Sequence, residues 1–124
     1  MFHLPSTARI FLYARPTDMR CSFRGLYALV RNQLSQDPLS GYLFLFGSKR
    51  GNYLKALWWE GDGFAMFAKK LEKGTFQFPP IRFVDGVCQP IELERRQLLL
   101  LLEGIDTKSI KMLKRYRREL PKAA

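Results

Sequence analysis

Residues 41–70 constrain the fold of this chain more than any other stretch, because they alternate strand-length apolar runs with turn sequences. The predicted strands are 42–46, 53–59 and 64–68, and the turns between them are 47–52 and 61–63. The first run is continuously apolar, which is typical of a strand that is covered on both faces. A meander this apolar is not stable alone in water, so we expect helices or further strands to lie over it.

Two adjacent tryptophans, Trp58 and Trp59, end the second predicted strand. Successive side chains of a strand point to opposite faces of a sheet, so these two indoles must face different ways. We expect one to anchor a core, and the other to cover a second layer or to lie in a groove.

The length of 124 residues and the hydrophobic content of 47% predict one domain with a proper core. No apolar run approaches the roughly twenty residues that a membrane-spanning helix needs, and no signal peptide is evident. Cys21, Cys88 and a single histidine cannot form a four-ligand zinc site. We interpret the cysteines as buried thiols in a reducing cytoplasm, and we predict no metal or cofactor.

The chain is strongly basic, with 21 Lys and Arg against 11 Asp and Glu, which gives a net charge of +10. Residues 108–124 hold one acid, Glu119, and many of the cations: Lys108, Lys111, Lys114, Arg115, Arg117, Arg118 and Lys122. This balance favours a polyanionic partner, with nucleic acid first and an anionic membrane surface second. The alternative is a solvated tail that only aids solubility.

Turn and cap signals place the remaining elements around the meander. A strand is expected at 9–13, a short strand at 75–78, and a hairpin at 81–84 and 87–91 with Asp85-Gly86 as its turn. Thr17 or Asp18 is the expected N-cap of a helix that runs to about Leu34. A second helix begins near 92–94, carries five leucines at 98–102 and ends at Gly104, and residues 109–120 could form a basic helix.

These elements predict an α+β fold with a mainly antiparallel, curved sheet. The helix at 22–34 covers one face of this sheet, and the leucine-rich helix packs at an edge. The predicted domain spans residues 1–106, and residues 107–124 form a basic C-terminal helix or tail.

Several strings are similar to one known family. They include Pro16-Thr17-Asp18-Met19-Arg20, Trp58-Trp59, Gly61-Asp62-Gly63 and the string LLLEGID at 100–106. Over about residues 4–106 the chain resembles TnpB, the second-open-reading-frame accessory protein of bacterial insertion sequences of the insertion-sequence-66 type. It departs at Cys21 and Arg24, where that family commonly has Lys and Asp. The resemblance implies a helper of transposition that is encoded beside a separate, larger transposase.

The turn at 48–52 is the first candidate DNA contact, because it carries Lys49 and Arg50, with Lys55 beyond it. Adjacent cations on a hairpin tip can enter a groove or straddle phosphates, and Tyr53 or a tryptophan could stack on an unpaired base. The alternative is an exposed turn that is basic without a partner. For Arg20, an internal ion pair with Asp18 as N-cap is favoured over an anion site.

An enzyme is not expected. Mg²⁺-dependent nucleases use clustered carboxylates, but turn chemistry accounts for most of the candidate acids, which are Asp18, Glu60, Asp62, Glu72 and Asp85. We predict a non-catalytic accessory of transposition that binds DNA, the transposase or both. The alternative is a protein-interaction adaptor without direct DNA binding, and homodimerisation stays open. The predicted DNA-binding residues are Lys49, Arg50, Lys55, Lys108, Lys111, Lys114, Arg115, Arg117 and Arg118.

Overall fold

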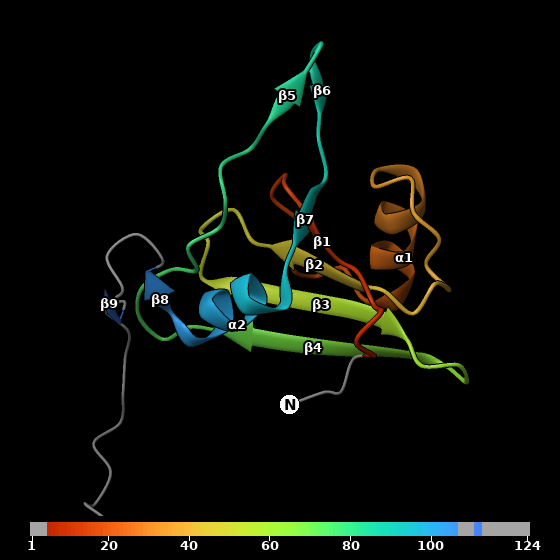
Figure 1. Ribbon diagram of the computed structural model, residues 1–124, viewed down its shortest axis with the longest axis horizontal. Coiled ribbons are helices and arrows are strands. Elements are labelled where there is room, and N and C mark those ends of the chain that lie inside the picture. Colours follow the sequence, from red (N-terminus) through yellow and green to blue (C-terminus); the bar gives the residue numbers. More distant parts are fainter. Residues whose placement is uncertain (1–4, 107–110, 113–124) are drawn as a thin grey trace, which may run out of the picture.

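The computed structural model describes residues 5–106 and 111–112, and it has an α+β fold built on one five-stranded sheet (Figure 1). The strand order is β4-β3-β2-β1-β7. Strands β1 (Ile10–Tyr13) and β2 (Leu43–Gly47) are parallel. The other pairs, which involve β3 (Tyr53–Trp59), β4 (Phe64–Lys70) and β7 (Ile91–Leu93), are antiparallel. The predicted fold class, with its mainly antiparallel sheet, is therefore confirmed.

The predicted meander forms β2, β3 and β4. All five residues of β2 are buried, because this strand is the middle one of the sheet and both of its faces are covered. Strand β3 has the predicted bounds, and β4 runs two residues further than expected, to Lys70. The local signals of the sequence were sufficient here, since both connections are short hairpin turns.

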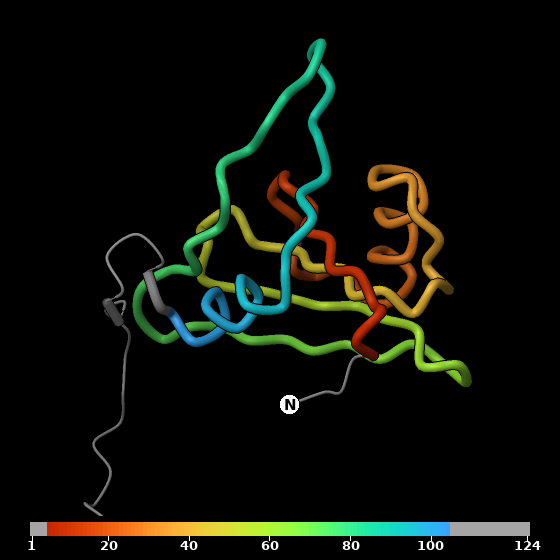
Figure 2. The backbone as a smooth tube through the Cα atoms, viewed as in Figure 1, coloured from red at the N-terminus to blue at the C-terminus, as the bar shows by residue number. Residues whose placement is uncertain are grey.

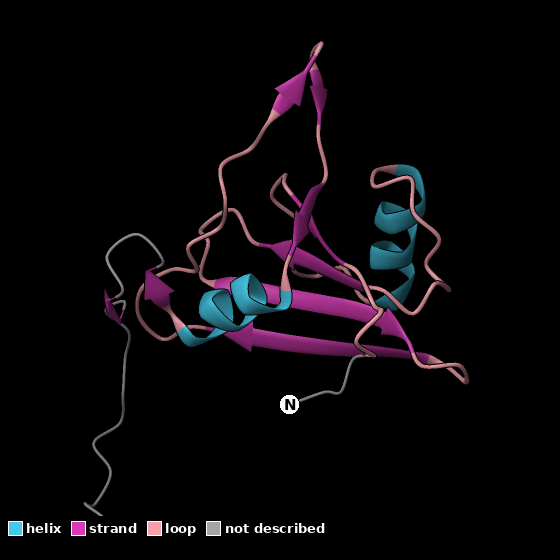
Figure 3. Ribbon diagram, viewed as in Figure 1, coloured by secondary structure: helices cyan, strands magenta, loops and turns pink. Residues whose placement is uncertain are grey.

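Each face of the sheet has its own hydrophobic cluster and its own helix. Helix α1 (Phe23–Asn32) packs on the face that carries Phe11, Phe44, Phe46 and Leu57. Helix α2 (Arg95–Glu103) packs on the opposite face, which carries Ile10, Leu12, Leu43, Leu45, Leu54 and Ala56. Figure 3 shows the two helices well separated, as this arrangement requires. The predicted edge position of the leucine-rich helix is wrong, because Leu98, Leu101 and Leu102 are buried against the sheet.

The first helix begins at Phe23, with Ser22 at the N-cap position, so the predicted cap at Thr17 or Asp18 is wrong. Both residues are engaged elsewhere. The backbone N–H of Thr17 donates to the carbonyl oxygen of Gly47 at 2.8 Å, and Asp18 Oδ1 accepts the backbone N–H of Arg20 at 2.9 Å. These bonds hold residues 17–20 in a turn that precedes the helix.

Residues 75–78 do not form the predicted strand. Phe76 is buried, and its backbone N–H donates to the carbonyl oxygen of Gly51 at 2.7 Å, but no ladder continues from this bond. The predicted hairpin is present and shorter, as β5 (Phe83–Val84) and β6 (Val87–Cys88). Asp85 and Gly86 turn it with φ of 51° and 78°, which suits a two-residue hairpin loop. Ile91 leaves the hairpin and pairs with β1 in β7.

Helix α2 ends at the left-handed Gly104, with φ of 76°, as predicted. Strand β8 (Ile105–Asp106) then pairs with β9 (Lys111–Met112), so these last two residues are not in the expected basic helix. The rest of that predicted helix lies outside the described residues. Within the described part of the chain, no helix has the length and apolar character to span a membrane.

Candidate nucleic-acid interface

The turn at residues 48–52, between β2 and β3, is held by hydrogen bonds on two sides. Inside the turn, the N–H of Ser48 donates to the carbonyl of Tyr53 at 2.9 Å, and the N–H of Gly51 donates to the carbonyl of Ser48 at 3.0 Å. On its outer side, the carbonyls of Gly51 and Asn52 accept backbone N–H groups from the segment after β4. The tip is therefore fixed against the body of the protein.

Lys49 and Arg50 lie exposed at this tip. Among the residues that the structure describes, neither has a hydrogen-bond or ion-pair partner. Each charge is therefore free to meet an anion from outside, on a backbone that already has a fixed shape.

Lys55 does not share this surface. Its side chain lies on the α1 face of β3 and is only 8% exposed, and its Nζ donates to the backbone carbonyl of Cys21 at 2.9 Å. The predicted placement of Lys55 beside the two tip cations is therefore corrected, since its ammonium group is part of the packing under the N-terminus of α1. Its neighbour Tyr53 is half-buried, with the ammonium of Lys70 5.8 Å from its ring centroid.

Other cations are engaged by nearby groups. Arg9 forms two hydrogen bonds to Glu92, at 2.8 and 2.6 Å, which join the start of β1 to β7 and lower the pKa of that carboxyl. The guanidinium of Arg20 pairs with Asp18 at 2.7 Å, and this ion pair, with the backbone N–H of Arg20, lowers the pKa of Asp18 to about 2. The predicted internal ion pair of Arg20 is confirmed.

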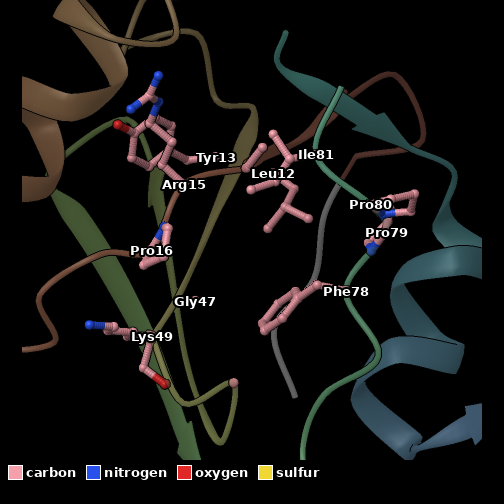
Figure 4. A pocket seen from close by; sticks show the side chains of 13 residues that line it. Leu12, Tyr13, Arg15, Pro16, Gly47, Lys49, Phe78, Pro79, Pro80 and Ile81 are labelled. Carbon is pink, nitrogen blue, oxygen red and sulfur yellow. The ribbon is translucent and has the colours of Figure 1, made fainter. Parts of the chain in front are cut away.

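A pocket of about 250 Å³ opens beside the tip (Figure 4). One wall comes from the end of β1 and the residues after it, including Tyr13, Arg15 and Pro16. Gly47, at the end of β2, and Lys49, in the turn after it, form a second wall, and residues 78–81 form the opposite wall. Figure 4 shows the Phe78 ring directed across the pocket toward Gly47.

Position 47 requires glycine for a steric reason. A Cβ at this position would lie 2.6 Å from the Phe78 ring, closer than two carbons can approach. This pocket cannot be predicted from local sequence patterns, because its walls come from three segments far apart in the chain. A glycine at the end of an apolar strand, which often marks a close approach of another group, was the signal present.

Hairpin β5–β6 projects away from the sheet (Figure 2). It also exposes apolar side chains. Phe83, Val84 and Val87 are 56%, 54% and 61% exposed. The guanidinium carbon of Arg15 lies 6.0 Å from the Phe83 ring centroid, so this cation lies between the pocket and the hairpin.

The family of IS66 Orf2-like proteins matches residues 8–112 of the chain. The chain belongs to this family. Two relatives from Sinorhizobium fredii are the uncharacterized protein y4jC, 36% identical over 103 residues, and the uncharacterized protein y4hO, 38% identical over 105 residues. Each alignment covers 83% of this chain, and 84% and 87% of the respective relative. No solved structure matches the chain significantly. The resemblance seen in the sequence is thus confirmed.

The motif residues of this IS66 Orf2-like chain have clear structural positions. Trp58 is 7% exposed in the α2-side core, and its Nε1 donates to Glu60 Oε1 at 3.1 Å. Trp59 is half-buried and meets the Phe64 ring edge-on at 5.0 Å. Residues 61–63 turn the chain from β3 to β4, with the N–H of Glu60 donating to the carbonyl of Gly63. Pro16 lines the pocket, and Met19 packs against the α1-side core.

The candidate carboxylates do not come together in the described part of this IS66 Orf2-like chain. No group of three or more His, Cys, Asp or Glu side chains there could hold a metal ion. Of the predicted tail contacts, Lys111 is in β9. The others lie outside the described residues: Lys108, Lys114, Arg115, Arg117 and Arg118.

Proposed function

We propose that this chain is a non-catalytic accessory protein of insertion-sequence transposition that binds DNA through the turn at 48–52. Membership of the IS66 Orf2-like family supports the role in transposition. The observation that carries DNA binding is the pair of unpartnered cations, Lys49 and Arg50, on a tip held by backbone hydrogen bonds. Such contacts to phosphates fix the position of a protein on DNA.

The basic C-terminal segment is the second proposed contact. Residues 108–124 carry seven cations and one acid, in a chain whose net charge is +10. This charge would attract DNA over a distance of about a Debye length, which is roughly 8–10 Å at physiological salt. We propose that the tail strengthens binding without selecting a sequence, and that the tip fixes the orientation.

We also propose that the protein acts in the cytoplasm with its thiols reduced. Cys21 and Cys88 are both free cysteines and are partly buried. Thiols of this kind are usual in a compartment that glutathione and thioredoxin keep reducing.

The test is a binding titration against three DNAs: a duplex from the end of the element, a random duplex of equal length, and a single strand. Phosphate contacts release counterions, so log affinity should fall linearly with log salt, by about 0.9 per contact for a duplex. A truncation that removes residues 113–124 should have a shallower slope, because it lacks five cations and one acid. Binding that is absent, or that does not respond to salt, would contradict the proposal.

One observation favours a second candidate, a protein-interaction adaptor for the transposase. Phe83, Val84 and Val87 expose apolar surface on a projecting hairpin, and apolar surface of this kind commonly marks an interaction site. An apolar interface should persist at high salt, unlike phosphate contacts. Co-purification with the transposase at high salt, lost on replacing Val84 and Val87 by Ser, would support the adaptor. The same co-purification from the double variant would count against it.

A further inference from the structure

We propose that the pocket beside the turn at 48–52 binds one unpaired nucleobase of a DNA strand, with Lys49 and Arg15 placed for its flanking phosphates. This inference rests on the proposed DNA binding and adds a strand form to it. It assigns the stacking role to Phe78, in place of the candidates from the sequence, Tyr53 and the two tryptophans.

The size and lining of the pocket fit a single planar ring. Its volume of about 250 Å³ lies below the range of about 300–1,000 Å³ that is usual for larger ligands. Its walls include Phe78 and Pro79, which are both half-buried. Tyr13 lines it too, but its ring packs on the α1 side of the sheet, against Phe46. Aromatic and apolar faces accept any base, because every base has a π-face.

The Phe78 ring is held in place before a ligand arrives. It packs against the backbone of Gly47, where no Cβ fits, and its centroid is 5.8 Å from that of Phe76. Phe76 is 3% exposed and is tied to Gly51 by its backbone N–H. Little side-chain freedom remains to be lost, which lowers the entropic cost of stacking a base on this ring.

The charges at the rim select an anionic ligand. Arg15 and Lys49 both line the pocket and are exposed, and no acidic side chain is among its described lining residues. A nucleotide combines the flat apolar ring that suits the interior with phosphates that suit this rim. A neutral aromatic side chain from a protein partner would leave both cations without an anionic group to contact.

The wild-type protein gives a first test. Thymidine monophosphate, titrated into labelled protein, should shift the amide NMR signals of Gly47, Lys49 and Ile81, which surround the pocket. Inorganic phosphate at equal concentration is the control. Equal shifts from phosphate alone, or no shifts from the nucleotide, would overturn the assignment of a base to this pocket.

The second test compares Phe78→Ala with Phe23→Ala, a matched loss of one aromatic ring at the exposed start of α1. Base stacking is worth about 1–3 kcal/mol per base. Phe78→Ala should therefore weaken binding of a thymidine oligonucleotide roughly 5- to 150-fold. Affinity for a fully paired duplex should not change, and Phe23→Ala should change neither affinity. Phe78→Leu keeps apolar bulk without an aromatic face, so it gives the same comparison if the Ala variant unfolds.

The two proposals fail in distinguishable ways. Unchanged single-strand affinity in both Phe78 variants would overturn the base pocket, and salt-dependent duplex binding through Lys49 and Arg50 would still stand. If the wild-type protein binds duplex and not single strands, the base pocket is likewise overturned and the proposed duplex binding still stands. A wild-type protein that binds none of these DNAs would overturn the proposed DNA binding itself, and the pocket assignment with it.

Discussion

The Nζ of Lys55 donates a hydrogen bond to the backbone carbonyl oxygen of Cys21, 2.9 Å away, and so ties the middle of β3 to the start of α1. The side chain is 8% exposed, with its alkyl stem in the packing between sheet and helix. This bond satisfies a carbonyl just before the helix. The sequence suggests that Lys55 contacts DNA, whereas this hydrogen bond gives Lys55 a role in stability.

Replacing Lys55 by Met tests this role. Met keeps an apolar stem but leaves the carbonyl of Cys21 without its donor, so the free energy of unfolding should fall by about 1–3 kcal/mol. DNA affinity, measured where the variant is folded, should not change. Urea titration of this variant and of Lys73→Met, an exposed lysine in the turn after β4, provides the comparison. The control should stay within about 0.5 kcal/mol of the wild type.

The sequence predicts the elements whose signals are local. Apolar runs and glycine-rich turns define β2 to β4, and Gly104 marks the end of α2. Pairings between distant segments have no such signal. The parallel contact of β1 with β2, the return of residues 91–93 to β1, and the burial of Lys55 all depend on where other elements pack.

In the candidate site, too, the residues with a local sequence signal can be predicted and the others cannot. Lys49 and Arg50 are found from the sequence, because a hairpin turn is local and cations at its tip must be exposed. The pocket is not, because Tyr13, Gly47 and Phe78 meet only once the sheet and the segment after β4 are assembled. The expected strand at 75–78 fails for a related reason: Phe76 fills a core position, and its backbone N–H donates to Gly51 in the turn, outside any strand ladder.

The adjacent tryptophans should respond unequally to replacement by Ala. Trp58 is 7% exposed in the α2-side core and donates to Glu60, so Trp58→Ala should cost about 3–5 kcal/mol of unfolding free energy. Trp59 is half-buried, and its replacement removes mainly the contact with the Phe64 ring. Trp59→Ala should therefore cost less than Trp58→Ala: about 1 kcal/mol for the lost ring contact, together with a smaller loss of buried area. Thermal and urea unfolding measure both. Equal losses would contradict the difference in burial.

Thr17 carries a buried hydroxyl without a hydrogen-bond partner among the described residues. An unpaired buried hydroxyl costs about 1–3 kcal/mol in folded proteins, so Thr17→Val should raise the free energy of unfolding by about 1 kcal/mol. Thr17→Ser keeps the hydroxyl and loses a methyl group, and should instead be less stable by roughly 0.8 kcal/mol. A destabilised Val variant in calorimetry would show that the hydroxyl has a partner.

The ion pair of Asp18 with Arg20 predicts a pH dependence. The pKa of Asp18 is lowered from 3.8 to about 2 in the folded protein, chiefly by the side chain of Arg20. A lowered folded pKa stabilises the protein above the unfolded value, and this contribution is lost as pH falls from about 4 to about 2. The effect should be small, because both side chains are exposed.

Melting temperatures of the wild type and Asp18→Asn, measured between about pH 6 and pH 2, test this dependence. The wild type should be the more stable protein at the upper end, and the two curves should converge at the lower end. Asp62→Asn, an exposed turn carboxylate, is the control for a general loss of negative charge. A difference that is constant over the whole range would rule out titration of Asp18 as its origin.

The tip of the β2–β3 turn decides between direct DNA binding and the adaptor. Lys49 and Arg50 are exposed, and the turn is closed by bonds from its backbone and from Ser48 Oγ, so neither side chain supports the fold. The double variant Lys49→Ala, Arg50→Ala should stay within about 0.5 kcal/mol of the wild type in unfolding free energy. Its DNA affinity should fall, because up to two phosphate contacts are lost.

Fluorescence anisotropy over a range of salt concentrations measures this loss. The slope of log affinity against log salt should become shallower by about one to two units. The matched control is Arg24→Ala, Arg31→Ala, which removes the same charge from the exposed side of α1. If both double variants reduce affinity equally, the effect is one of net charge and the tip has no special position. If neither changes affinity or slope, the tip is an ordinary exposed turn, and the adaptor becomes the better account of this protein.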